Sequence, residues 1–541
     1  MTQQLLPEVD VLVVGWGAAG ACAAIEALDA GLSVAILDRF NGGGASQKSG
    51  GVVYAGGGTR HQRAAGYEDS AQAMFDYLKH EVGTVISDAT LQRFCEQSVE
   101  NLQWLEEQGA PYAHQVPPGG KTSYPSDGYY LYFSGNEMVP DCAGSQAPAP
   151  RGHRTVGKGH GGAVLYQALR EACLRKGAQV HTQTRVMGLI QDDAGRVVGV
   201  QARQIPPGSP EAKRHADVSA RSEAVNNTRP KLASQLRKQA ESIEARSAQQ
   251  VEVRARLGVV LSTGGFIFNR EMVRQFAPKY VTNFRIGSSG CAGDGHRLAS
   301  GLGAALDHMH HVTAWRFINP PSALTGGIAV NARGERIENE ETYGARLGYA
   351  ICEENEGRAW LILDSQIRWA ALKQILFGRL WWFQWAPAFV LLFIQARSAR
   401  TVSALARKIG LPVAALAHAV EMNNQSAAGA CPDPVGKSEH SRVSLRGPRF
   451  YAVDIGVANP FFPLGALTLG GIRVNEESGQ ALREDGSLIE GLYASGRAAV
   501  GVASNRYVSG LSLADCVFSG RRAGRALALT APHGALGDES A

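Results

Sequence analysis

The sequence predicts an α/β fold, in which an α+β second domain interrupts a Rossmann-like dinucleotide-binding domain. Residues 9–38 read as a buried strand, a glycine-rich turn, an alanine-rich helix and a second strand that ends on an acid. Glycine turns at strand ends recur at 262–266, 293–296 and 495–510. Because these turns are far apart in the chain, we expect the C-terminal segment to complete the first domain around an inserted second one.

The turn Gly15-Trp16-Gly17-Ala18-Ala19-Gly20 carries the strongest signal. Gly15 permits a tight turn, Gly17 allows close approach of a pyrophosphate, and Gly20 allows the helix to pack on the strand. The pyrophosphate is expected on the free N–H groups at the start of the helix. Asp38, at the end of the second strand, is placed to accept hydrogen bonds from a ribose. Strand, turn, helix and acid agree, which predicts a dinucleotide site.

Composition limits the function classes. The chain has 541 residues, enough for two or three domains, and a formal net charge of +5, which does not indicate a nucleic-acid partner. Its 8 cysteines have no paired spacing, which argues against a disulfide framework, a zinc site or an iron–sulfur cluster. The first strand begins by Val9 and leaves no room for a signal peptide. We therefore expect a cytoplasmic protein.

The predicted domain boundaries follow from the glycine turns. The nucleotide domain takes residues 1–309 and 446–541, and the second domain takes 310–445. Residues 205–256 contain no aromatic residue and are rich in charge, so we expect a charged, flexible insertion at a hairpin tip, either a solvated helix or a partly disordered loop. A basic face for acidic lipid or a partner is the alternative.

Several motifs together resemble a known family. They are VVGWGAAGACAA, SGGVVYAGGGT, STGGF, GDGHRLA, GERIENEETYGARLG and LYASGRAAVGVASNRYVSGLSLADCVFSGRRAG. The chain resembles the flavoproteins of the fumarate reductase/succinate dehydrogenase superfamily and, within it, the 3-ketosteroid dehydrogenases. The last two motifs are most similar to the Δ4-(5α) branch. The resemblance implies an FAD-binding domain with an inserted catalytic (cap) domain, and FAD held without a covalent link between the two.

The resemblance, with the glycine turns, also gives the expected cofactor contacts. The residues predicted to bind FAD are Gly15, Gly17, Ala18, Ala19, Gly20, Asp38, Arg39, Ser49, Gly50, Gly51, Gly264, Gly265, Asp294, Ser495, Gly496, Ser512 and Leu513. The chain contains one dinucleotide fingerprint, so the substrate rather than NAD(P)H is expected to touch the flavin.

Dehydrogenation beside a ketone requires a base for the α-proton, a donor for the enolate oxygen and a hydride acceptor. Tyr507 is the candidate base, with Ser509 two residues on as a proton relay. Tyr343 resembles the third tyrosine of the family's site. Gly510 is placed to offer a backbone N–H to the ketone oxygen at a helix N-terminus. The alternative for Tyr507 is a buried tyrosine bonded to backbone.

The expected activity is therefore the dehydrogenation of a 3-oxo-5α-steroid at C4–C5, with an unidentified electron acceptor as a further partner. Three rivals stay open: a Δ1-dehydrogenase, a fumarate-type reductase and a membrane-associated electron-transfer subunit. Arginines clamp dicarboxylates in the fumarate-reducing relatives, but Arg336 and Arg346 lie in apolar surroundings and are interpreted as structural ion-pair residues.

A group of tyrosines and a group of histidines each have a structural and a functional interpretation. The tyrosines could line a substrate pocket but more often pack in a core; they are Tyr124, Tyr129, Tyr130 and Tyr132. The histidines lack carboxylate or cysteine partners, so surface or core positions are expected rather than a metal site; they are His308, His310 and His311.

Residues 375–395, ILFGRLWWFQWAPAFVLLFIQ, approach the ~20 apolar residues needed to cross a bilayer. A crossing would separate the two halves of the nucleotide domain, and Arg379 and Pro387 weaken a straight span. One interpretation is a monotopic helix or Pro-broken hairpin that dips into the inner face of the membrane, where a sterol-like substrate would enter. The other is a buried helix or an oligomer contact.

Overall fold

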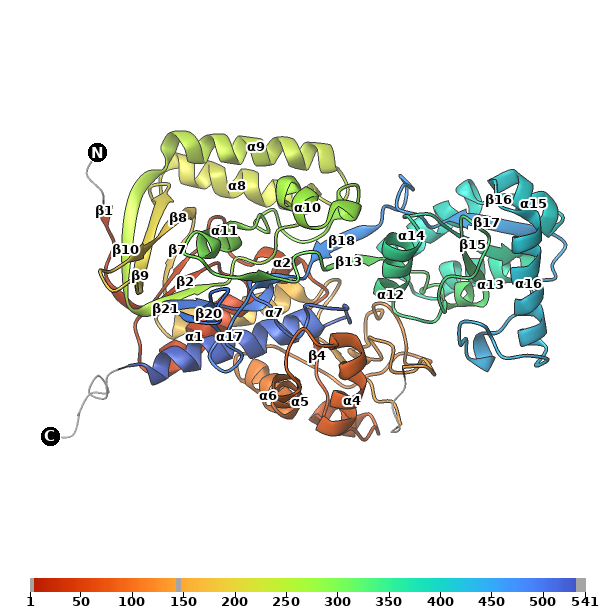
Figure 1. The fold of residues 1–541 in the computed structure, drawn as a ribbon, viewed down its shortest axis with the longest axis horizontal. Coiled ribbons are helices and arrows are strands. Elements are labelled where there is room, and N and C mark those ends of the chain that lie inside the picture. Colours follow the sequence, from red (N-terminus) through yellow and green to blue (C-terminus); the bar gives the residue numbers. More distant parts are fainter. Residues whose placement is uncertain (1–3, 143–146, 532–541) are drawn as a thin grey trace.

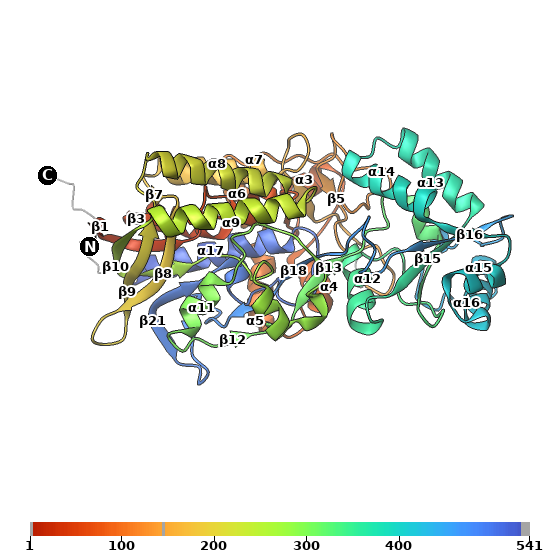
Figure 2. The ribbon, with the colours of Figure 1, turned by 90° about the horizontal axis from the view of Figure 1, so that it is seen from above.

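The structure is a computed structural model that describes residues 4–142 and 147–531. Figure 1 shows two parts side by side, a larger one that holds β2 (Val9–Val14) and α17 (Leu511–Leu529) and a smaller one built around β15 (Ala359–Asp364). The view from above shows the same division (Figure 2). The α/β class predicted from the sequence is confirmed.

The larger part is organised around a nine-stranded sheet. Its main path runs β20-β21-β10-β2-β3-β7, and β8, β9 and β1 extend it from β10. The strands are β1 (Gln4–Leu5), β2, β3 (Val34–Leu37), β7 (Gln179–His181), β8 (Thr184–Gln191), β9 (Val197–Gln204), β10 (Gln249–Leu261), β20 (Gln480–Leu482) and β21 (Leu488–Ala494). β2, β3, β7, β10 and β21 pair in parallel, so their carboxyl ends meet at one edge.

The helices of the larger part lie against this sheet or beside it. They are α1 (Ala18–Asp29), α2 (Gly44–Lys48), α3 (Arg60–Ala64), α4 (Ala71–Val82), α5 (Asp88–Glu96), α6 (Ser98–Glu107), α7 (Gly162–Arg175), α8 (Pro210–Val225), α9 (Pro230–Ser247), α10 (Arg270–Phe276), α11 (Asp294–Ser300) and α17. Short sheets join them: β4 (Val52–Tyr54), β5 (Leu131–Tyr132) and β6 (Gly152–Arg154); β11 (Phe284–Arg285), β13 (Val312–Trp315) and β18 (Gly465–Thr468); β12 (Leu306–Asp307) and β19 (Gly471–Ile472).

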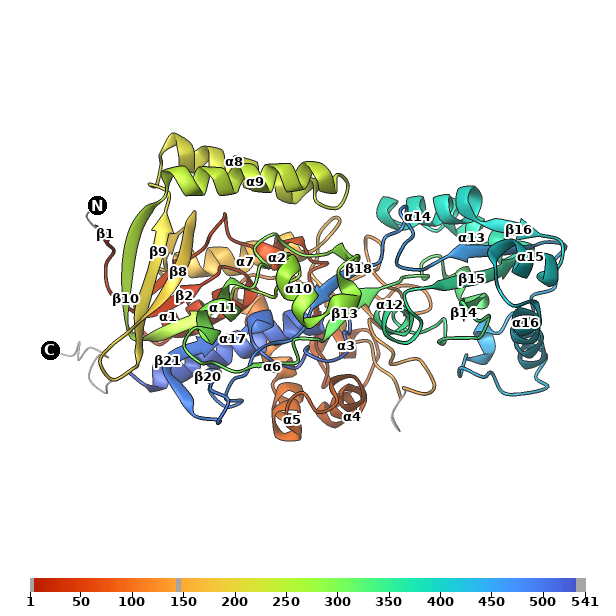
Figure 3. The same ribbon diagram turned by 45° about the horizontal axis from the view of Figure 1, so that its top comes forward.

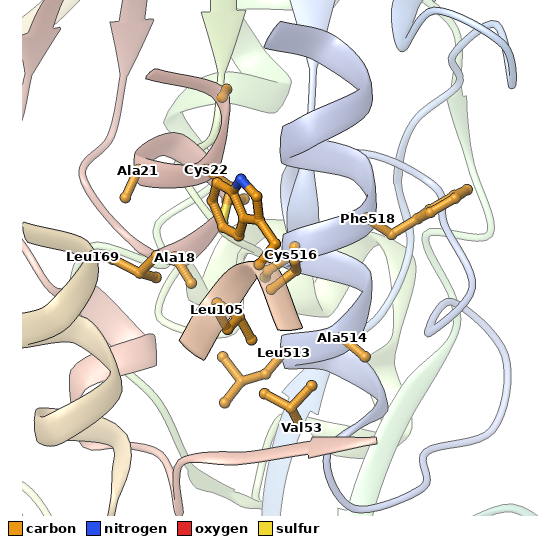
Figure 4. Close-up of a cluster of buried hydrophobic side chains, with 14 of the residues drawn as sticks. Ala18, Ala21, Cys22, Val53, Leu105, Leu169, Leu513, Ala514, Cys516 and Phe518 are labelled. Atoms are coloured by element: carbon orange, nitrogen blue, oxygen red, sulfur yellow. The ribbon is translucent and has the colours of Figure 1, made fainter. Parts of the chain in front are cut away.

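The main core lies where α1 and α17 pack together, far apart in sequence but adjacent in space. Figure 4 shows side chains of both helices gathered with Leu105 of α6, Leu169 of α7 and Val53 of β4. The approach is close because α17 carries glycine here: a Cβ on Gly520 would lie 2.4 Å from the Ala19 carbonyl oxygen. This packing fixes the fingerprint turn against the C-terminal helix.

The smaller part is built on a four-stranded antiparallel sheet in the order β14-β15-β17-β16. Its elements are α12 (Gly344–Tyr349), α13 (Ser365–Phe377), α14 (Trp382–Phe389), α15 (Val402–Ile409), α16 (Val413–Ala427), β14 (Ile328–Asn331), β15, β16 (Arg397–Ala399) and β17 (Phe450–Asp454). β17 follows the predicted boundary at 445, yet it pairs with β15 and β16. The second sheet therefore takes a strand from beyond residue 445.

Of the two alternatives for the insertion 205–256, a solvated helix or a partly disordered loop, the structure shows helix. Residues 210–247 form two long helices, α8 and α9, which lie side by side over the larger part (Figures 1 and 3). Pro210 and Pro230 occupy the first turns of these helices, and the Ser209 side chain caps α8. α9 begins at Pro230 and buries Leu236 and Ile243. Leu232 is exposed.

The apolar segment 375–395 is broken rather than continuous. α13 ends at Phe377, Arg379 adopts a positive φ of 52°, and α14 follows with Pro387 inside it and a π-helix, η4 (Val390–Gln395), after it. Among the described helices, none combines the length and the apolar character needed to cross a membrane.

Candidate active site

A groove of about 580 Å³ opens at the carboxyl edge of the parallel strands. Many of the predicted cofactor residues line it: Gly15, Gly17, Ala18, Ala19, Asp38, Arg39, Gly264, Asp294 and Ser495. They come from the ends of β2, β3, β10 and β21 and from α1 and α11. The parallel register brings these ends together, which is where open α/β sheets bind ligands.

A second cavity of about 450 Å³ adjoins the groove on the side of the smaller part. Four further predicted cofactor residues line it: Ser49, Gly50, Ser512 and Leu513. The groove and the cavity have lining residues in common, among them Lys48, Arg497 and Cys516. The two spaces are therefore continuous, and together they form an elongated site of the kind that a dinucleotide requires.

The remaining predicted cofactor residues line neither space; they are Gly20, Gly51, Gly265 and Gly496. Gly20 acts through packing, because a Cβ there would lie 2.1 Å from the Gly15 carbonyl oxygen. Its predicted role in bringing helix and strand together matches this geometry. The other three also sit against neighbouring atoms at distances that leave no room for a side chain.

Asp38 lines the groove as expected, but its carboxylate already has partners. It accepts backbone N–H groups from Trp16 at 2.9 Å, Phe40 at 2.8 Å and Gly42 at 3.1 Å. These bonds hold the fingerprint turn against the loop that follows β3. A ribose contact from Asp38 stays a prediction.

The polar groups of the groove fit a dinucleotide. Within the described chain, several buried groups that line it have no protein partner: Arg185 Nε, Ser219 Oγ, Ser495 Oγ and Arg497 Nη1. Buried donors without partners are rare in folded proteins and require an acceptor. The phosphate, ribose and ring atoms of a bound FAD would supply such acceptors.

All four predicted catalytic residues line the second cavity: Tyr343, Tyr507, Ser509 and Gly510. The Tyr343 and Tyr507 rings come from α12's N-cap and the loop before α17, and their centroids are 6.5 Å apart. Trp315 packs edge-on against Tyr507 at 4.9 Å. The structure thus brings together residues that are more than 160 positions apart in the sequence.

Tyr132 belongs to the same cluster, although the sequence favoured a packing role for it. Its hydroxyl lies 3.2 Å from Ser509 Oγ, and Ser134 Oγ donates to the Ser509 carbonyl oxygen at 2.9 Å. Both residues come from the segment at β5. Tyr124 lines the cavity as well, and its hydroxyl donates to the Gly50 carbonyl oxygen at 2.8 Å. Of the four tyrosines, Tyr124 lines the cavity, whereas Tyr132 is buried behind it and contacts the lining residue Ser509.

Burial keeps the phenols of this cluster protonated. Desolvation raises the pKa of Tyr507 to about 12, and the positive charge of Arg497 opposes that rise. The pKa of Tyr343 is raised well above its usual value by burial and by the nearby Tyr507. A hydrogen bond with Ser509 partly lowers it. Arg497 is therefore the group that favours a Tyr507 phenolate.

Sequence reasoning missed Arg497, which lines both the groove and the cavity. Arg497 directly follows Gly496 in the motif SGRAAVG. The glycine turn at Gly496 is therefore the signal from which Arg497 could have been predicted. Its guanidinium is buried, and Nη2 donates to Cys291 Sγ at 3.4 Å. No carboxylate in the described ranges pairs with Arg497, and a buried arginine of this kind at the junction of two cavities is expected to bind a ligand.

Arg336 and Arg346 form structural ion pairs, as the sequence predicted. Arg336 is almost fully buried in ion pairs with Glu340 at 2.8 Å and Asp433 at 3.3 Å, and Arg346 pairs with Glu338 at 3.1 Å. Neither arginine lines the second cavity.

The rings of the histidine tract pack against one another, one pair stacked and the other edge-on. The His308 and His311 ring centroids are 5.0 Å apart, and those of His310 and His311 are 4.4 Å apart. Within the described residues, no group of three or more side chains could hold a metal ion.

Comparison with known proteins gives a family and several relatives. Residues 10–513 match the protein family described as an FAD binding domain. The chain is 43% identical to the 3-oxo-5-alpha-steroid 4-dehydrogenase of Comamonas testosteroni, over 90% of this chain and 92% of that one. It is 26% identical to a 3-oxosteroid 1-dehydrogenase of Mycobacterium tuberculosis, over 94% and 95%.

Among solved structures, the fold matches the 3-ketosteroid-delta4-(5alpha)-dehydrogenase from Rhodococcus jostii RHA1, solved in complex with 4-androstene-3,17-dione. The TM-score is 0.81 and the identity 31%, over 98% of both chains.

Proposed function

The chain belongs to the FAD binding domain family, and on that premise we propose that this FAD-dependent oxidoreductase introduces a C4–C5 double bond into a 3-oxo-5α-steroid. The observation that carries the proposal is the second cavity. Its walls are apolar, with Phe317, Ile318, Leu324 and Leu391 among them, and its hydroxyl groups gather around Ser509. An apolar ketone fits such a cavity better than a dicarboxylate, since among the described residues Arg497 is the one arginine that lines it.

In the proposed reaction the steroid loses a proton from C4 and a hydride from C5. Bound FAD supplies the hydride acceptor. Tyr507, as phenolate, takes the C4 proton and becomes a neutral phenol. Ser509 relays a proton along the hydroxyl groups of Tyr343 and Tyr132, each of which releases one proton as it accepts another. Arg497 lowers the energy of the phenolate through its charge. A complete turnover would also require an electron acceptor, which is still to be identified.

Gly510 is proposed to bind the ketone oxygen. It caps the N-terminus of α17 with a φ of 92° and lines the cavity. In the part of the chain that the structure describes, its N–H has no acceptor. A free amide at a helix N-terminus stabilises the negative charge that develops on an enolate oxygen.

Anaerobic mixing of the holoenzyme with a panel of saturated 5α-3-ketosteroids tests the function. We expect bleaching of the flavin absorbance, with a 4-ene-3-ketone as the product. A 1-ene product would reassign the enzyme to the Δ1 class, and oxidation of the reduced protein by fumarate alone would reassign it to the fumarate-type reductases. No bleaching by any steroid would contradict the proposal.

We further propose that the protein contacts an anionic membrane surface through residues 375–395 and their neighbours, here called the apolar patch. Its exposed side chains are Trp369, Leu376, Phe377, Trp382, Trp385, Phe389 and Ile394. Residues 365–420 contain no acidic residue, and their Lys and Arg side chains are Arg368, Lys373, Arg379, Arg397, Arg400, Arg407 and Lys408. Tryptophan and basic side chains around an apolar surface suit a lipid headgroup region.

The apolar patch is continuous with the wall of the substrate cavity. On α14, Trp382, Trp385 and Phe389 are exposed, whereas Phe383 and Ala388 line the cavity. A helix with one side in lipid and the other on the cavity would let an apolar substrate enter without crossing water.

Co-flotation of the holoenzyme with phosphatidylglycerol vesicles tests the membrane proposal, with phosphatidylcholine vesicles and high salt as comparisons. We expect binding to anionic vesicles that weakens as salt rises. Protein that stays in the soluble fraction, or that forms a dimer through the apolar patch, would contradict the proposal.

A further inference from the structure

The α8–α9 hairpin, which the sequence suggested was a flexible insertion, covers one side of the nucleotide groove. Four residues of α8 line that groove: Ser219, Ala220, Glu223 and Ala224. Figure 3 shows the two helices lying together above the sheet of the larger part. One face of α8 is therefore part of the wall of the groove.

One stripe of α8 makes these contacts. His215, Ser219 and Glu223 are spaced four residues apart, so they lie on the same face of the helix. His215 and Glu223 form polar contacts with residues of the groove walls or of α9. Within the described chain, the Ser219 hydroxyl forms none.

At one end of the stripe, His215 and Arg39 meet on Glu244 of α9. Arg39 Nε and Nη2 each lie 2.9 Å from a carboxylate oxygen of Glu244, and His215 Nε2 lies 3.0 Å from Oε1. Burial raises the pKa of Glu244, but the hydrogen bonds from His215 and Arg39 lower it to about 2. Arg39 itself follows β3 and lines the groove. The bidentate geometry fixes both helices to that wall.

At the other end, Glu223 forms an ion pair with Lys48 and accepts the Ser289 N–H at 2.8 Å. Lys48 Nζ also donates to the Glu223 carbonyl oxygen at 2.7 Å. Lys48 ends α2 and lines both the groove and the catalytic cavity. The α8–α9 hairpin is thus held by polar contacts at two sides of the groove, at Glu244 and at Glu223.

Between these two ties, Ser219 is 5% exposed and lines the groove, yet its Oγ has no hydrogen-bond partner in the described chain. We infer that Ser219 is an additional FAD-binding residue and that the α8–α9 hairpin, held by Glu223 and Glu244, is the cover that retains the noncovalent cofactor. A buried hydroxyl held in place on both sides is expected to have a partner. The inference depends on FAD, not on the identity of the substrate.

The first test measures the dissociation constant of FAD from the reconstituted apoprotein, by quenching of flavin fluorescence. For Ser219→Ala we expect binding about 3- to 10-fold weaker, the effect of one lost hydrogen bond. Ser242→Ala is the matched control, since Ser242 is exposed on α9, and it should bind FAD as the wild type does. Equal dissociation constants for Ser219→Ala and the wild type would overturn the role of Ser219.

The second test measures the rate of FAD release into an excess of a flavin-binding trap. Glu244→Gln loses the charge that Arg39 and His215 share, so release should be several-fold faster than from the wild type. Glu241→Gln removes an exposed charge from the same helix and should release FAD at the wild-type rate. If Glu244→Gln, with an unchanged circular dichroism spectrum, released FAD no faster than the wild type, the hairpin would not be the cover.

Discussion

Two aromatic side chains of the apolar patch offer the sharpest test of membrane contact. Phe377 is 79% exposed and Trp382 is 63% exposed. Burying a large apolar side chain contributes about 1.5–3 kcal/mol, so burying these exposed fractions contributes about 3 kcal/mol in total. Phe377→Ala with Trp382→Ala should therefore lower the partition coefficient onto anionic vesicles about 100-fold.

The assay is sedimentation of sucrose-loaded phosphatidylglycerol vesicles over a range of lipid concentrations. The control removes two equally exposed leucines from the larger part, Leu5 at 71% and Leu529 at 84% exposed, by substitution with alanine. This control should partition as the wild type does. An equal loss in both double variants, or no loss in Phe377→Ala with Trp382→Ala, would refute the proposed orientation.

Three further predictions concern the site and the fold. Arg497→Gln removes the charge that opposes the rise in the Tyr507 pKa, so the ascending limb of the kcat–pH profile, along which Tyr507 loses its proton, should move to higher pH; an unchanged profile would exclude this coupling. Gly510→Ala should lower both kcat and the free energy of unfolding, the latter by about 2 kcal/mol. A side chain at φ 92° is strained, and its Cβ would lie 2.8 Å from the Tyr54 nitrogen. Steady-state kinetics measures the first effect and urea denaturation the second. Burial lowers the pKa of His153 to about 3 and of His296 to about 4, below the unfolded value near ~6.5. Each therefore stabilises the fold above pH ~6.5 and loses about 1.4 kcal/mol per pH unit as the pH falls from there toward the folded pKa. Urea denaturation between pH 7 and pH 5 should show this loss, and a constant free energy would contradict it.

The sequence predicted the parts of the site whose signal is local. The fingerprint strand and the second strand are both confirmed, at Val9–Val14 and Val34–Leu37. Tyr507 and Ser509 were found because they stand in one short segment before a helix. Local patterns suffice in these places because turn, strand and helix are set by neighbouring residues.

The parts that depend on distant contacts were harder to predict. Tyr132 reaches Ser509 only because β5 lies beside the start of α17, a contact across 377 positions. The charges of the insertion 205–256 indicated either a solvated helix or a partly disordered loop, with no contact to the groove. In the fold, Glu244 pairs with Arg39 from 205 positions away, which no helical period can reveal.

The central claim is that Tyr507 removes a proton from a steroid that also reduces the flavin. Stopped-flow bleaching of the flavin in Tyr507→Phe holoenzyme, mixed anaerobically with a saturated 5α-3-ketosteroid, tests it most directly. We predict a variant that keeps its yellow cofactor and its steroid affinity but bleaches at least 100-fold more slowly, the contribution expected of a general base. Bleaching at the wild-type rate would show that another group takes the proton.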